Sequence, residues 1–281
     1  MKANIVTKRL SFEYFPPKTP DGHKKLIEET APQLWALSPE FMSVTYGAGG
    51  STRDFTKQVV SQLKAKSMQI APHLSFGGDN EERMIELLTE YKNVGVNRIV
   101  ALRGDMPSGM GAVRLVYANE LVAFIRRHFG NQFHLEVAAY PEIHPQSENY
   151  ASDIHFLKEK FNAGADSGIT QYFYNTDAYF YFMDDCRKAG IDKPIYPGIM
   201  PITNYANLSR FSAACGAELP RWMVRKLDSY KDDAASIRSF GIDIVSKLCE
   251  TLLQGGAPGL HFYTMNQIEP MATIVRQFNL K

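Results

Sequence analysis

The sequence predicts an α/β fold, a single (β/α)8 barrel with one extra helix before the eighth strand. Its 281 residues are 44% hydrophobic and 22% charged, which is enough apolar material for one large core. Short β-branched or aromatic runs alternate with amphipathic stretches, the pattern of parallel βαβ units. No linker or composition break divides residues 1–281, so we expect one domain.

Eight short runs rich in β-branched and aromatic residues are the expected strands. They cover residues 9–15, 41–46, 68–74, 98–104, 133–140, 167–173, 194–200 and 259–264. Helical patterns lie between them, and several end with a glycine just past the last turn, at Gly95, Gly130, Gly164 and Gly190. The stretch from 204 to 256 is longer than one helix needs, which predicts an inserted helix around residues 220–230. Eight strand and helix pairs favour a closed barrel over an open sheet.

Composition argues against several classes of partner. With 31 Lys and Arg against 30 Asp and Glu, the net charge is +1, so neither nucleic acid nor an anionic membrane is an expected partner. Long apolar stretches and a signal-peptide core are lacking, which predicts a cytoplasmic protein. The three cysteines and seven histidines show no metal-ligand spacing. We therefore expect no metal. A small-molecule substrate and a homo-oligomer are expected as well, although composition alone does not indicate them.

Polar residues gather where the expected strands end. In barrels of this type the catalytic groups lie at the C-terminal ends of the strands. The unusual polar residues at these positions are Glu13, Thr45, His73, Asp105, Tyr140, Glu142 and Gln171. Any one of them alone is more often a hydrogen-bonded core residue, but their convergence on one end of the barrel indicates a site.

Glu13 is the sharpest candidate. Its neighbours Phe12, Tyr14 and Phe15 predict partial desolvation, which would raise the pKa of the carboxyl toward the range of a general acid. The Pro16-Pro17 pair ends the strand and so places Glu13 near the barrel mouth. The alternative is a strand-face glutamate bonded to a barrel neighbour such as a lysine.

Three further features can each be interpreted either as part of a ligand site or as ordinary surface structure. The glycine-rich stretch 46–51 resembles a phosphate-cradling turn, but the dinucleotide fingerprint fails because Thr52 stands where its last glycine belongs. The Arg103-Gly104-Asp105 turn is either part of a site or a surface ion pair. Lys158 and Lys160 could meet a phosphate or form a solvated helix face.

Eight motifs occur in order across nearly the whole chain: SFEYFPP, SVTYGAGG, APHL, IVALRGD, VAAYPEIHP, ITQYF, PGIMPITNY and HFYTMN. With them the chain resembles the bacterial methylenetetrahydrofolate reductase family. The resemblance implies an FAD-containing barrel that reduces 5,10-methylenetetrahydrofolate to 5-methyltetrahydrofolate with NADH or NADPH, supplying methyl groups for methionine.

The resemblance also implies roles for matched residues. Glu13 would be the general acid that protonates the folate nitrogen, Asp105 would lie beside flavin and pterin, and Gln171 would contact nicotinamide and folate. The implied cofactor-binding residues are Thr45, Tyr46, Ala48, His73, Arg103, Gly104, Asp105, Tyr117, Ala118, Tyr140, His144, Asp153 and Lys160. The implied substrate-binding residues are Glu13, Asp105, Gln171, Tyr205 and Gln267.

The chain departs from the family pattern at three positions. Phe156 and Glu159 stand where relatives place Asn and Arg near the FAD, and Gln267 stands where they carry Arg. The chain ends soon after the barrel closes, so we expect no regulation by a methyl-donor product. The rival functions are a flavin-free, folate-dependent methyltransferase and a non-catalytic folate-binding regulatory subunit.

Overall fold

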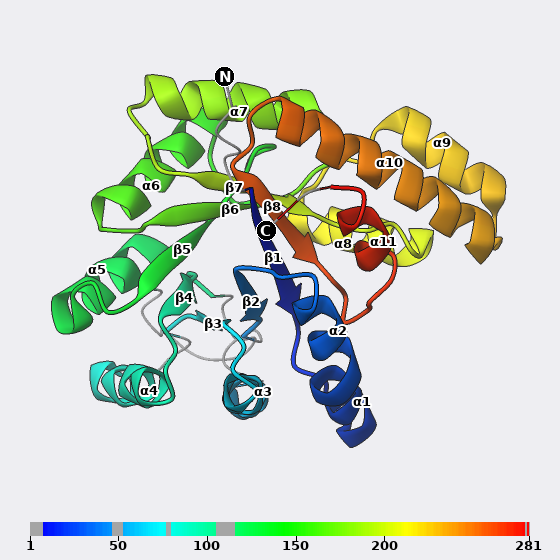
Figure 1. Ribbon diagram of the computed structural model, residues 1–281. Helices are drawn as coiled ribbons and strands as arrows, with labels where there is room; N and C mark the ends of the chain where they lie inside the picture. The colour runs from blue at the N-terminus through cyan, green and yellow to red at the C-terminus, as the bar shows by residue number, and fades with distance from the viewer. Residues whose placement is uncertain (1–7, 47–52, 77–79, 105–115, 279, 281) are drawn as a thin grey trace, which may run out of the picture.

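The computed structural model describes residues 8–46, 53–76, 80–104, 116–278 and 280. Eight parallel strands close into a barrel in sequence order, with helices around the outside (Figure 1). The strands are β1 (Arg9–Tyr14), β2 (Phe41–Val44), β3 (Ile70–Leu74), β4 (Arg98–Ala101), β5 (His134–Ala139), β6 (Ser167–Tyr172), β7 (Ile195–Ile199) and β8 (Gly259–Tyr263). Each lies within a predicted run, so the predicted (β/α)8 barrel is confirmed.

The described helices connect the strands across the outside of the barrel. They are α1 (Pro20–Lys25), the π-helical turn η1 (Leu26–Thr30), α2 (Ala31–Trp35), α3 (Arg53–Ala65), α4 (Glu81–Asn93), α5 (Ala118–Phe129), α6 (Tyr150–Asn162), α7 (Thr176–Lys188), α8 (Tyr205–Cys215), α9 (Arg221–Tyr230), α10 (Ala234–Gln254) and α11 (Met271–Val275). The extra helix predicted before the last strand is α9. The four predicted helix-ending glycines all have positive φ, between 54° and 112°. None of these helices combines the length and apolar character needed to cross a bilayer.

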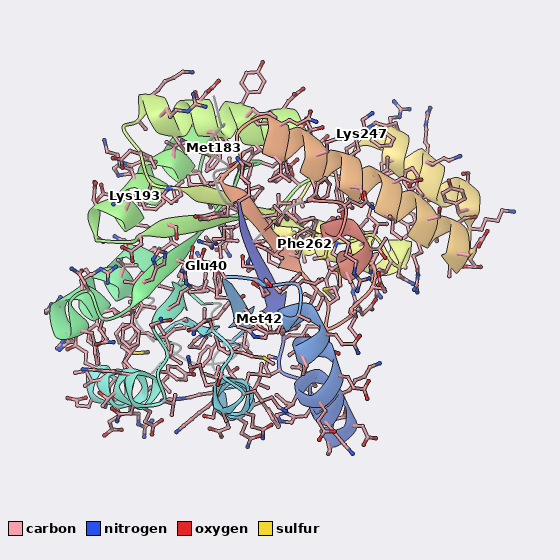
Figure 2. All side chains as sticks on the ribbon, in the orientation of Figure 1. Glu40, Met42, Met183, Lys193, Lys247 and Phe262 are labelled. Atoms are coloured by element: carbon pink, nitrogen blue, oxygen red, sulfur yellow. The ribbon has the colours of Figure 1, made fainter. Side chains whose placement is uncertain are left out.

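Side-chain alternation along the strands separates two environments. Leu10, Phe12 and Tyr14 of β1 point outward and are buried in the core between strands and helices. The outward-facing Met42 of β2 and Phe262 of β8, both labelled in Figure 2, are also fully buried. The other face of each strand lines the barrel interior, where side chains from all the strands meet.

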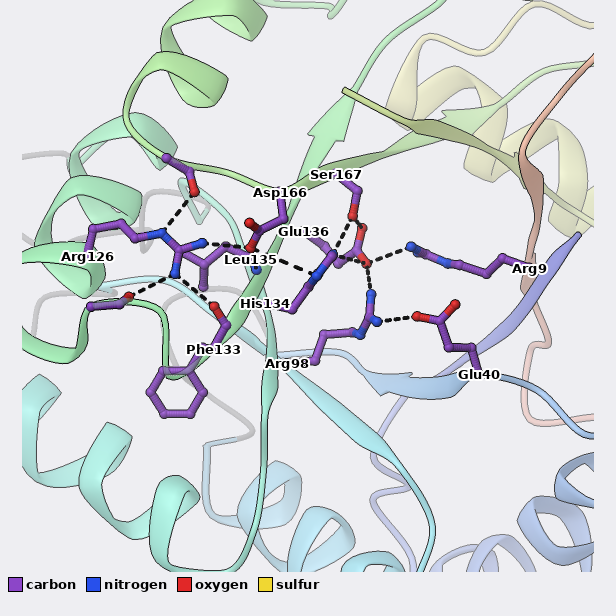
Figure 3. Close-up of polar contacts among 12 residues, drawn as sticks. Arg9, Glu40, Arg98, Arg126, Phe133, His134, Leu135, Glu136, Asp166 and Ser167 are labelled. Atoms are coloured by element: carbon purple, nitrogen blue, oxygen red, sulfur yellow. Dashed lines mark hydrogen bonds and ion pairs between the residues drawn. The ribbon is translucent and has the colours of Figure 1, made fainter. Parts of the chain in front are cut away.

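A charge network fills the N-terminal end of the barrel interior (Figure 3). The fully buried carboxylate of Glu136 lies 2.9 Å from Nη1 of Arg9 and accepts hydrogen bonds from Arg98 and, at 2.7 Å, from Oγ of Ser167. Burial opposes ionisation of Glu136, but Arg9, a hydrogen bond from His134 and Arg98 outweigh it and hold its pKa well below the usual 4.5. The guanidinium of Arg9 also lies over the ring of Tyr196, with Cζ 3.5 Å from the ring centroid.

A small apolar layer lies above this network in the barrel interior. It consists of Phe41, Ala71, Val100 and Ile169, from four different strands, with Leu102 packed against it. The ring of Phe41 contacts the Arg9 guanidinium and stacks on the ring of His261. The layer therefore separates the basal charges from the polar side chains at the mouth.

Glu136→Gln should lower the free energy of unfolding by about 3–5 kcal/mol, because it leaves Arg9 buried without a counter-charge. Glu40→Gln is the matched control, since Glu40 bonds the same Arg98 from the rim and its side chain is 44% exposed. We expect that control to cost at most about 1 kcal/mol. Urea unfolding followed by circular dichroism measures both, and equal losses would show that burial of Glu136 is not the source of its effect.

Candidate functional site

The described residues line two adjoining cavities at the C-terminal ends of the strands. The first, the Glu13 cavity, has a volume of about 550 Å³ and is bounded by Glu13, His73 and Gln171, among others. The second, the Lys160 cavity, has about 540 Å³ and reaches outward to α5 and α6. Both are lined by Leu102, Arg103, Ala138, Tyr140, His144 and Gln146. A ligand can therefore extend from one cavity into the other.

Glu13 meets two histidines at the mouth of the barrel. Its Oε2 lies 3.1 Å from Nε2 of His73 on β3 and 3.4 Å from Nε2 of His261 on β8. The hydroxyl of Ser43 donates to the same oxygen at 3.4 Å. The Glu13 side chain is 16% exposed and borders the cavity with His73, whereas His261 is fully buried beneath them.

The expected direction of the Glu13 pKa shift was wrong. Burial does oppose ionisation, but the charge of His73 and hydrogen bonds from both histidines outweigh it and lower the pKa of Glu13 from 4.5 to about 2. Phe12 and Tyr14 do not surround the carboxyl because alternate strand residues point to the opposite face. The predicted alternative of a paired strand-face glutamate is closer to the structure, with histidines instead of a lysine as partners.

His261 and Ser11 are members of the site that the sequence predictions missed. The Ser11 hydroxyl lies 2.8 Å from Nδ1 of His261, whose Nε2 faces Glu13. Burial lowers the pKa of His261, although the hydrogen bond and charge of Glu13 partly oppose this. Ser11 precedes Glu13 by two positions on the same inward face, and His261 lies within the motif HFYTMN. The strand alternation carried a signal for both.

Tyr263 forms part of the wall beside Glu13 because Gly198 leaves room for it. The Tyr263 hydroxyl donates to the carbonyl of Thr170 at 2.7 Å, and the N–H of Gly198 donates to Oγ1 of Thr170 at 2.9 Å. A Cβ atom at position 198 would lie 2.2 Å from that carbonyl and 2.7 Å from the Tyr263 ring. Only glycine fits there.

The Lys160 cavity combines charged and aromatic side chains. Nζ of Lys160 donates to the carbonyl of Ala138 at 2.8 Å. Burial lowers the pKa of Lys160 to about 8, with a smaller lowering from Arg103 and an opposing effect of Asp153. The rings of Tyr140 and His144 meet edge to face, with centroids 4.5 Å apart. Two cations, two acidic side chains (Glu148 and Asp153) and a pair of rings thus line one cavity, so an anionic group can lie at Lys160 and Arg103 and a planar group at the rings.

Gly104 brings the backbone close to this cavity. It has a φ of 79°, and a Cβ there would lie 2.5 Å from Oγ of Ser75. A side chain at this position is therefore excluded both by conformation and by space.

Many of the predicted site residues line one of the cavities. In the Lys160 cavity these are Tyr46, Arg103, Gly104, Tyr117, Ala118, Tyr140, His144, Asp153 and Lys160. Glu13, His73 and Gln171 line the Glu13 cavity. Asp153 also fixes the loop after β5, because it accepts from the N–H of His144 at 2.7 Å. The oxygen of Gln171 accepts from the N–H of Tyr172 at 3.0 Å, which orients the amide.

Other predicted residues lie elsewhere. Thr45, Tyr205 and Gln267 border neither cavity: Thr45 hydrogen-bonds to the end of β1, Tyr205 begins α8, and Gln267 is exposed. Phe211, one and a half turns after Tyr205, lines the Glu13 cavity instead. Ala48 and Asp105 fall outside the described residues.

The structure also places the residues at which the chain departs from the family pattern, on α6 and in the segment after β8. Phe156 lines the Lys160 cavity and is 55% exposed, while Glu159 accepts a hydrogen bond from Asn162 on the same helix. Beyond β8, Asn266 pairs with the backbone of Phe15 through both its amide oxygen and its amide nitrogen, at 3.1 and 2.8 Å. Asn266 therefore fastens the end of β1 just beyond Glu13.

Comparison with known proteins identifies relatives along the whole chain. A family model described as methylenetetrahydrofolate reductase matches residues 2–279. The 5,10-methylenetetrahydrofolate reductase of Escherichia coli K12 is 36% identical over 92% of this chain and 87% of its own length. That of Buchnera aphidicola is 38% identical over 96% of this chain and 91% of its own length. The probable methylenetetrahydrofolate reductase (NADH) of rice is 36% identical over 96% of this chain, and the chain spans about half the length of this and the other plant relatives it matches.

Solved structures agree on the fold. A protein from Clostridium thermocellum that binds two copies of 5-methyl-5,6,7,8-tetrahydrofolic acid has a TM-score of 0.68 and 18% identity, covering 97% of this chain and 95% of its own. A dihydropteroate synthase from Xanthomonas albilineans has a TM-score of 0.51 and 13% identity, covering 96% and 91%. At these identities the likeness concerns the barrel alone.

His73→Phe should raise the pKa of Glu13 well above about 2, because burial then acts with less opposition. Carbon-13 NMR of protein labelled at the glutamate carboxyl carbons measures this, with the Glu13 signal assigned by its loss in Glu13→Gln. We expect the wild-type signal to stay ionised down to acid unfolding. His155→Phe, which changes an exposed histidine on α6, is the control. A wild-type Glu13 that titrates near neutral pH would contradict the ion-paired site.

Proposed function

The chain belongs to the methylenetetrahydrofolate reductase family, and on that premise we propose that it reduces 5,10-methylenetetrahydrofolate to 5-methyltetrahydrofolate. The reductant is NADH or NADPH, and hydride passes through FAD in a ping-pong cycle. The observation that carries the proposal is the pair of joined cavities, one with a carboxylate and histidines and the other with Lys160 and Arg103. The name of the rice relative specifies NADH, which favours NADH here.

The lining of the Lys160 cavity fits FAD. Lys160 and Arg103 offer positive charge for a diphosphate, and Tyr117 and Ala118, at the start of α5, border the same space, where the positive end of the helix dipole favours an anion. Gly104 lets the backbone approach a flat ring system. Bound there, the flavin supplies a carrier that takes a hydride from the nicotinamide and gives it to the folate.

Glu13 and its two histidines would manage the proton that the folate nitrogen needs. The carboxyl is ionised in the described state, so a proton held by the cluster resides on an imidazole. A substrate that fills the Glu13 cavity displaces water from the carboxylate, which favours a neutral acid and imidazole over the ion pair. The proton then moves to Oε2 of Glu13, which borders the cavity. Glu13 thus remains the proposed general acid, with the histidines as its proton source.

The remaining implied roles stand as parts of the same proposal. Gln171 would hydrogen-bond to nicotinamide and folate, and Thr45, Asp105, Tyr205 and Gln267 would contact ligands as their matched positions imply. The whole of residues 1–281 would act as one catalytic domain in a cytoplasmic homo-oligomer. Its product would supply methyl groups for methionine.

The purified protein should be yellow, and its flavin should bleach when NADH is added without air. Lys160→Met should weaken FAD binding by roughly tenfold or more, as expected for loss of a buried cation beside a phosphate. Lys158→Met is the matched control, because Lys158 lies two residues away and borders neither cavity. Flavin fluorescence titration measures both. Protein that stays colourless with excess FAD would favour one of the flavin-free rivals.

Glu13→Gln should separate the two half-reactions. Bleaching by NADH needs no proton on a leaving nitrogen, so its rate should stay within about tenfold of wild type. Oxidation of the reduced flavin by methylenetetrahydrofolate should slow by at least about 10², the low end of the range for general acids. Stopped-flow absorbance follows each step. Equal slowing of both steps would instead assign Glu13 a structural role.

A further inference from the structure

Glu142 joins two segments that meet at the rim of the barrel mouth. Its Oε2 accepts a hydrogen bond of 2.8 Å from the backbone N–H of Glu218, just beyond the end of α8. Nearby, Pro145 packs on Gly216 so closely that a Cβ at 216 would lie 2.8 Å from its ring. The loop after β5 and the C-terminal end of α8 therefore form a seam with one polar and one apolar contact.

Both sides of this seam form walls of the Glu13 cavity. Tyr140, His144, Pro145 and Gln146 come from the loop after β5, and Phe211, Ala214 and Cys215 come from α8. Glu142 itself borders a small adjacent cavity together with Gln171 and Cys215. Any loosening of the seam therefore changes the space in which a ligand lies.

The backbone of this loop is strained, which favours its opening when the contact with α8 weakens. Ile143, the residue after Glu142, has a φ of 73°, a conformation that is unfavourable for a β-branched side chain. The contact between Glu142 and Glu218 helps to keep this loop in place against that strain.

We propose that Glu142 is a positioning residue for the substrate: it holds α8 against the loop after β5 and so sets the width of the Glu13 cavity. The inference rests on the proposed function, because it identifies the folate as the ligand held by this wall. It adds to that function a carboxyl outside the Glu13 cavity that holds two of its walls together.

The seam should respond to pH near neutrality. The titratable groups around Glu142 are Glu218 beyond α8, Cys215 on α8, Tyr172 on β6 and His144 on its own loop. Burial raises the pKa of Glu142 to about 7, with a further rise from the Glu218 carboxylate, while the hydrogen bond from the Glu218 N–H opposes them. Because this pKa lies above the ordinary 4.5, the closed seam favours the neutral carboxyl. The seam is tight below about pH 7 and loosens as pH rises through that value.

The first test is the KM for methylenetetrahydrofolate between pH 6 and 8.5, measured on the FAD-loaded full chain. We expect the wild-type KM to rise about threefold to tenfold across this range, because the ionised Glu142 carboxylate is poorly solvated in the closed seam and is repelled by Glu218, with kcat changed by less than about twofold. Glu142→Gln imitates the neutral carboxyl and should keep the low KM throughout. Glu218→Gln retains the backbone donor and removes the repelling charge, so the rise should move to lower pH.

Glu86→Gln is the matched control, an exposed glutamate on α4 that borders neither cavity, and it should behave as wild type. A pH profile that is the same in wild type and Glu142→Gln would overturn the proposal. So would a Glu218→Gln profile that does not move.

Amide hydrogen exchange across residues 212–219 tests the seam without any turnover. After correction for intrinsic rates, protection of the wild type should fall about threefold to tenfold between pH 6 and pH 8, and that of Glu142→Gln should stay constant. Equal protection at both pH values in wild type would refute the seam. If exchange behaves as expected but the protein does not reduce methylenetetrahydrofolate, the proposed function fails. The role of Glu142 in holding α8 against the loop after β5 then still stands.

Discussion

The inward face of β1 imposes the constraint on which the rest of the site depends. Three alternate residues, Arg9, Ser11 and Glu13, point into the closed barrel, where Arg9 and Ser11 are buried and Glu13 is only 16% exposed, so each needs a partner from another strand. Glu136 of β5 pairs with Arg9, His261 of β8 with Ser11, and His73 of β3 with Glu13. Apolar residues at these three positions would need no polar partners from other strands. They would, however, leave the barrel mouth without an ionisable cluster.

The apolar layer of Phe41, Ala71, Val100 and Ile169 separates these charged residues into two groups in different surroundings. Below it, Glu136 is fully buried beside Arg9 and Arg98, which holds its pKa well below the usual 4.5. Above it, Glu13 keeps 16% of its side chain exposed at a cavity, and its Oε2 faces the imidazoles of His73 and His261. The same residue type therefore pairs with arginines at one end of the barrel and, in the proposed mechanism, transfers a proton at the other.

The sequence predicted the strands well because each is a short apolar run closed by polar or glycine residues, and the motif order carried the family. It predicted the surroundings of Glu13 wrongly because the residues beside it in sequence face away, while His73 and His261 come from distant strands. For Lys158 and Lys160 both interpretations were open. The rotation of α6 turns Lys160 toward the carbonyl of Ala138 and the cavity, while Lys158 borders neither cavity, so only Lys160 remains a candidate for a phosphate contact. Nothing in the sequence indicated that position 198 must be glycine, because a side chain there is excluded only by where the Thr170 carbonyl and the Tyr263 ring lie in the folded barrel.

The chemistry of the site also depends on the joint between the first and last strands. His261 of β8 contacts both Ser11 and Glu13 of β1, and Thr264 donates to the carbonyl of Glu13 through its backbone N–H and its hydroxyl. Asn266 then binds the backbone of Phe15 beyond the strand end. Glu13 acquires these partners only when β8 docks against β1. The cluster of Glu13, His73 and His261 is therefore completed by the same contacts that close the barrel. A barrel left open at this joint would expose the Glu13 carboxyl to water without His261, and its pKa would then be set by solvent and His73 alone.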